Sequence, residues 1–188
     1  MKKGVIHGRF QGLHLDHMMY LKEGFKRSDY LLIGITNFDP FTNPKRSNIK
    51  LSQLSHFKLE ANPFTYYERM RMIKESLQEE GVPLEMFDIA PFPIEFPERI
   101  HNYAPLDAIY LMSIDDDWGR EKLKRLQELD LRTEVMYERT HADRLTSGTE
   151  IRKLIAKREK WEHLVPPAVY KYITTNGLDE RIRGLMPY

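Results

Sequence analysis

The strongest constraint on the fold is a nearly unbroken apolar run, Tyr30–Ile35, with the sequence YLLIGI. A half-exposed strand alternates apolar and polar residues, whereas an unbroken run is typical of a strand that is buried on both faces. Such strands occur in parallel sheets, whose connections need crossover helices. The run therefore favours an α/β fold in which strands and helices alternate along the chain.

The rest of the chain supplies this alternation. Further strands are predicted at residues 5–7, 87–90, 108–112 and 133–137, and helices at residues 64–80 and 117–129, among others. From Gly148 onward the pattern is helical. We therefore expect an α/β, Rossmann-like open parallel sheet of five strands, with helices on both faces and a helical C-terminal tail. Such sheets bind ligands at the carboxyl ends of the strands, where the strand order reverses.

Length and composition exclude several classes of protein. The 188 residues suit one domain, residues 1–188, of which residues 148–188 form the helical C-terminal part. The absence of cysteine excludes disulfides, thiolate zinc sites and cysteine nucleophiles. A net charge of +1 argues against a nucleic-acid partner. Without a membrane span or a signal peptide, the expected location is cytoplasmic, away from membranes. The sequence leaves open whether the chain forms a homo-oligomer.

The first candidate site directly follows the first predicted strand and reads GRFQGLHLDH, residues 8–17. Gly8 and Gly12 allow the backbone to approach a ligand, and the helix that begins nearby offers N–H groups suited to phosphate. His14 and His17 are three residues apart and point the same way on a helical turn. Two imidazoles placed there can donate hydrogen bonds to an α-phosphate as its charge redistributes. The alternative is a turn with two surface histidines; a zinc pair is disfavoured because no third local ligand is present.

The second candidate site reads TSGTEIR, residues 146–152. Ser147 and Glu150 fit a capping box at the start of a helix, which taken alone is an ordinary structural feature. The same helix start also gathers hydroxyl and amide donors from Ser147 and Thr149, and Arg152 adds a forked cation one turn later. Together these groups can hold the β- and γ-phosphates of a nucleotide.

Two further segments carry charged residues. Residues 37–62 are predicted to form a long loop, and this loop contains the basic residues Lys45, Arg46, Lys50 and Lys58. Such a run is either a solvated face or a mobile basic loop that closes over a triphosphate. The segment IDDDWG, residues 114–119, follows a predicted strand. Asp117 is a candidate helix cap, and Trp118 beside the carboxylates is a candidate contact for a base or ribose.

The two candidate sites resemble a known superfamily, the nucleotidyltransferases that include nicotinamide mononucleotide adenylyltransferases and small cytidylyltransferases. Its signatures are G-R-F-Q-P-x-H-x-G-H after the first strand and S-G/S/T-T-x-I-R at the start of a late helix, and both occur here in the right order. Residues 53–56, 62–69 and 161–184 look like the archaeal-type adenylyltransferases, so the resemblance spans most of the chain. The D-D-W stretch at residues 116–118 instead looks like the glycerol-3-phosphate-type cytidylyltransferases.

The resemblance implies a role for each matching residue. His14 and His17 would stabilise the α-phosphate, while Arg152, with Ser147 and Thr149, would hold the leaving pyrophosphate. The other candidate nucleotide-binding residues are Gly8, Arg9, Phe10, Gln11, Lys58, Asp116, Trp118 and Gly148. Such enzymes use Mg²⁺ and direct in-line attack without a covalent intermediate, and no protein metal ligand is implied.

Departures from the family pattern concern the substrates. Asp16 replaces the glycine of H-x-G-H, Gly12 replaces the usual proline, and residues 92–101 lack the tryptophan that would stack on nicotinamide. With the D-D-W stretch, these departures favour CTP and a small phosphorylated or phosphonate acceptor over the alternative, ATP with nicotinamide mononucleotide.

The resulting functional prediction is a nucleotidyltransferase that works by positioning and charge stabilisation. An acceptor oxygen attacks the α-phosphorus of a nucleoside triphosphate and pyrophosphate leaves, with no nucleophile supplied by the protein. A remote alternative is a non-catalytic nucleotide-binding sensor, in which Asp16 is the change that abolished activity.

Overall fold

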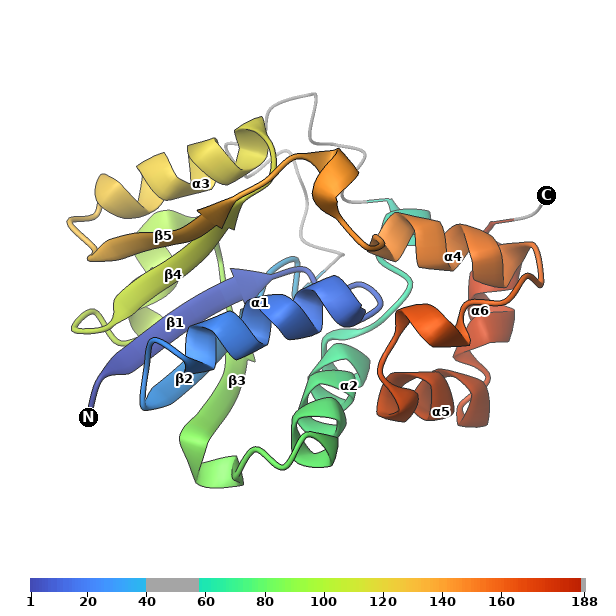
Figure 1. Ribbon diagram of the computed structural model, residues 1–188. Coiled ribbons are helices and arrows are strands. Elements are labelled where there is room, and N and C mark those ends of the chain that lie inside the picture. The colour runs from blue at the N-terminus through green and yellow to red at the C-terminus, as the bar shows by residue number, and fades with distance from the viewer. Residues whose placement is uncertain (40–57, 187–188) are drawn as a thin grey trace.

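The computed structural model describes residues 1–39 and 58–186. Its five strands form one sheet in the order β3-β2-β1-β4-β5, and every strand pairs in parallel with its neighbours (Figure 1). The strands are β1 (Lys3–Gly8), β2 (Tyr30–Ile35), β3 (Phe87–Pro91), β4 (Ile109–Ile114) and β5 (Thr133–Glu138). The strand order reverses between β1 and β4, so the expected Rossmann-like parallel sheet is confirmed.

Helices connect the strands and complete the chain. They are α1 (Leu15–Phe25), α2 (Tyr66–Glu79), α3 (Asp117–Gln127), α4 (Gly148–Ala156), α5 (Pro167–Thr175) and α6 (Leu178–Leu185). Short 3₁₀ turns are η3 (Leu59–Ala61), η4 (Leu84–Met86), η5 (Pro97–Asn102), η6 (His141–Asp143) and η7 (Glu162–Leu164). Figure 1 shows α4, α5 and α6 grouped beyond α2, which confirms the helical C-terminal part. None of the helices in residues 1–39 and 58–186 is long and apolar enough to span a membrane.

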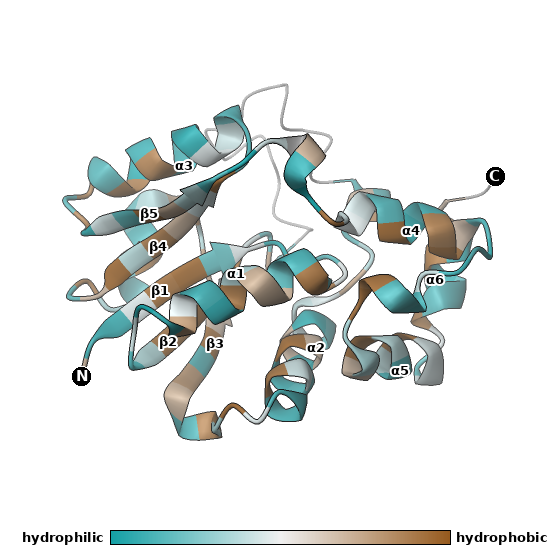
Figure 2. Ribbon diagram, viewed as in Figure 1, coloured by the Kyte–Doolittle hydropathy of each residue, from teal (hydrophilic) through white to brown (hydrophobic). Residues whose placement is uncertain are grey.

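The sheet is buried on both faces, which explains the unbroken apolar run at β2. Neighbouring residues of a strand point to opposite faces, so Val5 and Ile6 of β1 belong to different core clusters. The Ile6 cluster includes Leu21 of α1, Leu77 of α2 and residues of α4, α5 and α6. The Val5 cluster includes Leu126 of α3. In Figure 2 the hydrophobic colour is strong along β1 and β4, in the middle of the sheet.

Helix α2 begins slightly later than the pattern predicts. Thr65 is its N-cap and forms a reciprocal capping box with Glu68, so the helix starts at Tyr66 and not at Phe64. The helix buries Met72 completely. It also buries Arg69, which is an unusual residue to find at zero exposure.

Arg69 holds together the loops at the carboxyl edge of the sheet. Its guanidinium donates hydrogen bonds of 2.8 Å to the carbonyl oxygens of Arg9, Thr36 and Asn37. Arg9 directly follows β1, and Thr36 and Asn37 directly follow β2. One side chain from α2 therefore fixes the ends of two neighbouring strands at the edge where a ligand would bind.

We expect Arg69→Leu to destabilise the fold by at least about 3 kcal/mol, because it leaves three buried carbonyl oxygens without donors at about 1–3 kcal/mol each. Urea unfolding measures the change. Arg71→Leu on the same helix removes a surface ion pair with Glu75 and a long, exposed hydrogen bond to the Tyr67 hydroxyl, and should cost below about 1 kcal/mol. Equal losses in the two variants would contradict the role given to Arg69.

Candidate active site

A cavity of about 250 Å³ opens at the carboxyl edge of the sheet, between the ends of β1 and β4. This is the position where the strand order reverses. The lining includes all but one of the sequence-predicted site residues: Gly8, Arg9, Phe10, Gln11, His14, His17, Asp116, Trp118, Ser147, Gly148, Thr149 and Arg152. The exception, Lys58, is exposed just before η3 and is not among the described residues that line the cavity. Lys45, Arg46 and Lys50 lie outside the described residues.

The two histidines of the first motif lie directly against each other. His14 is the N-cap of α1, and its Nδ1 accepts a hydrogen bond from the His17 N–H at 3.4 Å. The two rings stack with their centroids 3.7 Å apart. His14 is buried and His17 is partly buried, so the alternative of two surface histidines is wrong. The spacing of the motif predicts both histidines on one helical turn, but His14 precedes the first helical residue. The two rings point the same way because the His14 side chain caps the helix at the backbone of His17.

Burial favours the neutral form of both histidines. The pKa of His14 is lowered to about 4, mainly by burial; Asp16 acts in the opposite direction, and the cations Arg144, Arg139 and Arg152 add to the lowering. Burial also lowers the pKa of His17 well below its usual value, and His14 and Arg9 add to this effect. Each neutral imidazole keeps one N–H donor, so the pair can donate hydrogen bonds to an anion without carrying charge itself.

The second motif forms the start of α4, although its cap differs from the prediction. Ser147 is the N-cap, and its hydroxyl accepts a hydrogen bond from the Glu150 N–H at 3.1 Å. In a capping box the Glu150 carboxylate would accept a hydrogen bond from the Ser147 backbone N–H. Here that carboxylate instead accepts one from the Thr146 hydroxyl at 3.2 Å. The helix begins at Gly148, and its amino end faces the cavity lined by Ser147, Gly148 and Thr149.

The two motifs touch each other at the carbonyl of Gln11. Arg152 donates to this oxygen through Nη1 at 2.9 Å and to the Thr149 hydroxyl through Nη2 at 3.1 Å. A Cβ on Gly148 would lie only 2.6 Å from the same oxygen, so the glycine permits the close approach. The Gln11 side chain is bound to the backbone N–H and carbonyl of Phe64, at 3.0 Å each. The two motifs, although far apart in the sequence, therefore line one cavity.

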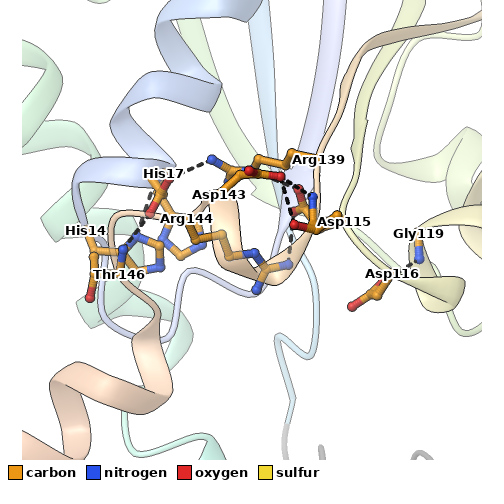
Figure 3. A network of polar contacts seen from close by, with 11 residues as sticks. His14, His17, Asp115, Asp116, Gly119, Arg139, Asp143, Arg144 and Thr146 are labelled. Carbon is orange, nitrogen blue, oxygen red and sulfur yellow. Dashed lines mark hydrogen bonds and ion pairs between the residues drawn. The ribbon is translucent and has the colours of Figure 1, made fainter.

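Asp16, which departs from the family pattern, is the buried centre of an ion-pair network that includes Arg139, Asp115 and Arg144. Figure 3 shows these last three residues near Thr146. The Asp16 carboxylate is 2% exposed and accepts hydrogen bonds from Arg139 at 2.6 Å and from the Thr146 N–H at 2.8 Å. Arg139 also binds Asp115 at 2.8 Å, and Arg144 pairs with Asp115 at 3.1 Å. The negative charge of Asp16 is therefore compensated, and it ties the start of α1 to the segment before α4. This compensation removes the reason for regarding Asp16 as a damaging change.

Gly12, the second departure, has a backbone conformation that proline cannot adopt. Its φ is +84°, in the left-handed region, whereas proline is fixed near about −65°. Here the turn between β1 and α1 therefore follows a path that the family's proline would not allow.

The acidic segment after β4 caps α3 through a different residue from the one predicted. The Asp116 carboxylate accepts a hydrogen bond from the Gly119 N–H at 2.8 Å, so Asp116 and not Asp117 is the N-cap (Figure 3). Trp118 lines the cavity, and the Arg125 guanidinium lies over its ring, 4.9 Å from the centroid.

Several cavity residues gave no recognisable signal in the sequence. Arg139 and Arg144 reach Asp16 and Asp115 only through the fold, because Asp16 and Arg139 are 123 residues apart. Asp115 itself belongs to the acidic segment that the sequence singled out. His7, Glu95 and Lys122 also line the cavity, on the side of the sheet that α3 covers. The predicted strand at residues 5–7 already ended at His7, but a lone histidine at a strand end gave no signal for a site.

Comparisons with known proteins establish the family. The cytidylyltransferase-like family model matches residues 5–154, which is most of the chain. The chain belongs to this family and is a nucleotidyltransferase, as the two motifs predict.

Particular relatives are similar over nearly the full length. The phosphonoformate cytidylyltransferase of Streptomyces viridochromogenes is 49% identical, with 96% of this chain and 95% of that protein covered. The nicotinamide-nucleotide adenylyltransferase of Saccharolobus solfataricus is 31% identical, with 99% and 98% covered. A bifunctional NMN adenylyltransferase/ADP ribose pyrophosphatase from Francisella tularensis shares the fold, with a TM-score of 0.67, 16% identity, and 97% of this chain but 52% of that chain covered.

We expect Gly148→Ala to lower turnover by as much as about 100-fold, because its Cβ would push α4 away from the Gln11 carbonyl and a shift of about 1 Å near reacting atoms can cost that much. Pyrophosphate release and thermal unfolding measure the effect. Gly184→Ala in α6 is the matched control, since no atom lies within 4 Å of its added Cβ and alanine favours helix by about 1 kcal/mol. Unchanged turnover in Gly148→Ala would show that the close approach is unimportant.

We also expect the stability of the unliganded protein to fall as the pH is lowered below about 6.5. There the unfolded chain takes up protons that His14, with a folded pKa of about 4, does not bind, so unfolding becomes easier. His14 alone should cost about 1 kcal/mol between pH 7.5 and 5.5. Urea unfolding at several pH values measures the slope.

The matched variants identify the source of this slope. His14→Asn combined with His17→Gln should reduce the pH dependence and leave the part that comes from His7, whose pKa burial also lowers. Asparagine still caps the helix, and neither new side chain titrates. His101→Asn, at an exposed position, should leave the slope unchanged. A double variant with the original slope would show that the two rings are not buried in the neutral form.

Proposed function

We propose that this enzyme transfers cytidine monophosphate from CTP to a phosphonate oxygen of a small acceptor and releases pyrophosphate. The observation that carries the proposal is the 49% identity to a phosphonoformate cytidylyltransferase over 96% of the chain. The adenylyltransferase relatives are less similar, at 31% for the one from Saccharolobus solfataricus. The missing tryptophan in residues 92–101 and the D-D-W stretch favour the same choice.

Different parts of the cavity suit different phosphates of the triphosphate. In this proposal the stacked rings of His14 and His17 donate hydrogen bonds to the α-phosphate as charge develops on its oxygens. The amino end of α4 holds the β- and γ-phosphates with the Ser147 and Thr149 groups, and Arg152 offers a buried Nε that has no partner in the part of the chain the structure describes. Asp116 and Trp118 would contact the nucleotide, and Lys58 would approach the triphosphate from outside the cavity.

The reaction then needs no covalent intermediate. An acceptor phosphonate oxygen attacks the α-phosphorus, the bond from that phosphorus to the bridging oxygen breaks, and pyrophosphate leaves with the electron pair. Positioning two anions and offsetting their charge is the main contribution of the protein. The cavity supplies this charge through Arg9, Arg152 and the arginines of the Asp16 network.

Mg²⁺ is part of the proposal and fits the residues present. In residues 1–39 and 58–186 no group of three or more histidine and carboxylate side chains is placed to hold a metal ion. The carboxylates of Asp16 and Asp115 are already paired with arginines. A cation that binds mostly phosphate oxygens and water suits such a site, and Mg²⁺ does so. When bound with the triphosphate, it would neutralise part of the phosphate charge.

A pyrophosphate-release screen tests the function. CTP, ATP, GTP and UTP are each combined with phosphonoformate or nicotinamide mononucleotide in the presence of Mg²⁺. We expect the pair of CTP and phosphonoformate to give the fastest release, and His17→Ala to lower it by at least about 100-fold, the usual cost of losing a transition-state donor. The exposed His163→Ala is the control and should retain activity. Release only with ATP and nicotinamide mononucleotide would reverse the choice of substrates, and near-normal release by His17→Ala would refute the histidine role.

A further inference from the structure

A second group of donors lies in the cavity, away from the histidine pair. His7 is the second-last residue of β1 and is 4% exposed, and neither ring nitrogen has a hydrogen-bond partner in the described chain. Its ring stacks on Phe92 with the centroids 4.6 Å apart, which fixes its orientation. Buried polar side chains without a partner are uncommon and need an explanation such as a ligand.

Two cations accompany His7. The Nη1 of Arg9 is buried without a partner. Lys122 of α3 lines the same cavity, and neither its ammonium nor the Arg9 guanidinium makes a hydrogen bond or ion pair with any residue in 1–39 and 58–186. Lys122 is close enough to His7 to lower the pKa of that ring, although burial is the larger cause. We call His7, Arg9 and Lys122 the α3-side donor group.

The α3-side donor group and the histidine pair lie on opposite sides of the sheet edge. His7 contacts Phe92, which belongs to the core cluster beneath α3. His14 and His17 are instead on α1, whose core residues belong to the other cluster. Arg9 lies between them, because it interacts electrostatically with His17 and Arg152 as well as with Lys122. If the triphosphate occupies the α1 and α4 side and the nucleoside reaches the start of α3, the part of the cavity lined by His7, Arg9 and Lys122 remains for the acceptor.

The chemistry of the α3-side donor group suits a small acid. A nicotinamide ring would need a stacking surface and amide partners, whereas this group offers N–H donors and positive charge. Glu95 and Asp116 lie near Arg9 and Lys122 and offset their charge when no ligand is bound.

We infer that the α3-side donor group is an acceptor subsite that binds a carboxylate attached to the phosphonate, with Arg9 next to the attacking phosphonate and Lys122 and His7 on the carboxylate. The inference rests on the proposed function, because it assumes that the triphosphate lies on the α1 and α4 side. The subsite determines specificity: it selects phosphonates that carry a carboxylate over those that carry a neutral group of similar size.

A matched pair of acceptors tests this subsite. Phosphonoformate has a carboxylate where hydroxymethylphosphonate has a neutral alcohol. With CTP and Mg²⁺, we expect Lys122→Met to lower kcat/KM for phosphonoformate by about 30-fold, mostly through KM, as for the loss of one charged hydrogen bond. The same variant should change kcat/KM for hydroxymethylphosphonate less than about threefold. A change of that size is usual for a substitution that removes no specific interaction. His7→Phe keeps a ring against Phe92. It should likewise lower kcat/KM for phosphonoformate relative to kcat/KM for hydroxymethylphosphonate.

Controls separate this inference from the proposed function. Lys124→Met, on an exposed residue of the same helix that pairs with Glu128 at 3.8 Å, should leave both acceptors unaffected. Calorimetric titration of the protein with phosphonoformate reports on the subsite even if no triphosphate is turned over, and binding that Lys122→Met weakens supports the inference in that case. Equal losses for both acceptors in Lys122→Met, or an unchanged preference for phosphonoformate, would overturn it. Wild-type turnover of neither phosphonate would instead refute the proposed function.

Discussion

At the carbonyl oxygen of Gln11 the loop after β1 meets the start of α4, two segments that are far apart in the sequence. This oxygen accepts a hydrogen bond from Arg152, and Gly148 brings the start of α4 against it so closely that any side chain there would collide. The loop after β1 and the amino end of α4 thereby become two walls of one cavity. Because Arg69 fixes the same loop from α2 and Asp16 holds Thr146, the site is positioned before any ligand binds. Such preorganisation is what a transfer reaction without a protein nucleophile requires.

The positive charges near the histidine pair of this cavity are carried by arginines and not by the two histidines. Burial keeps His14 and His17 neutral, so the positive potential comes from arginines, which stay charged. Arg139 is held by Asp16 and Asp115, and the family's glycine could not supply the first of these contacts. The carboxylate of Asp16 therefore both orients Arg139 and ties α1 to the segment before α4. Here a residue that seemed incompatible with phosphate binding stabilises the groups that surround it.

Local patterns predicted the fold and much of the candidate site. The apolar run of β2 and the spacing of the helices were sufficient for the parallel sheet, and the GRFQGLHLDH and TSGTEIR segments contain most of the cavity residues. Contacts between distant segments could not be predicted, because hydrogen bonds such as that from Arg139 to Asp16 leave no periodic trace in the sequence. The caps at Asp116 and Thr65 were misjudged by a residue or so, since neighbouring polar residues compete for the same N–H groups. The donors of His7 and Lys122 went unnoticed because each is unremarkable until the fold places both in one cavity.

The central claim is that one triphosphate spans the histidine pair and the start of α4. The most direct measurement is a crystal structure of the protein with Mg²⁺ and a CTP analogue in which a methylene group replaces the oxygen between the α- and β-phosphorus. We expect the α-phosphate within hydrogen-bond distance of His14 or His17, and the terminal phosphates at Ser147, Thr149 and Arg152. A triphosphate bound elsewhere, or one that contacts only one of these two groups, would contradict the claim.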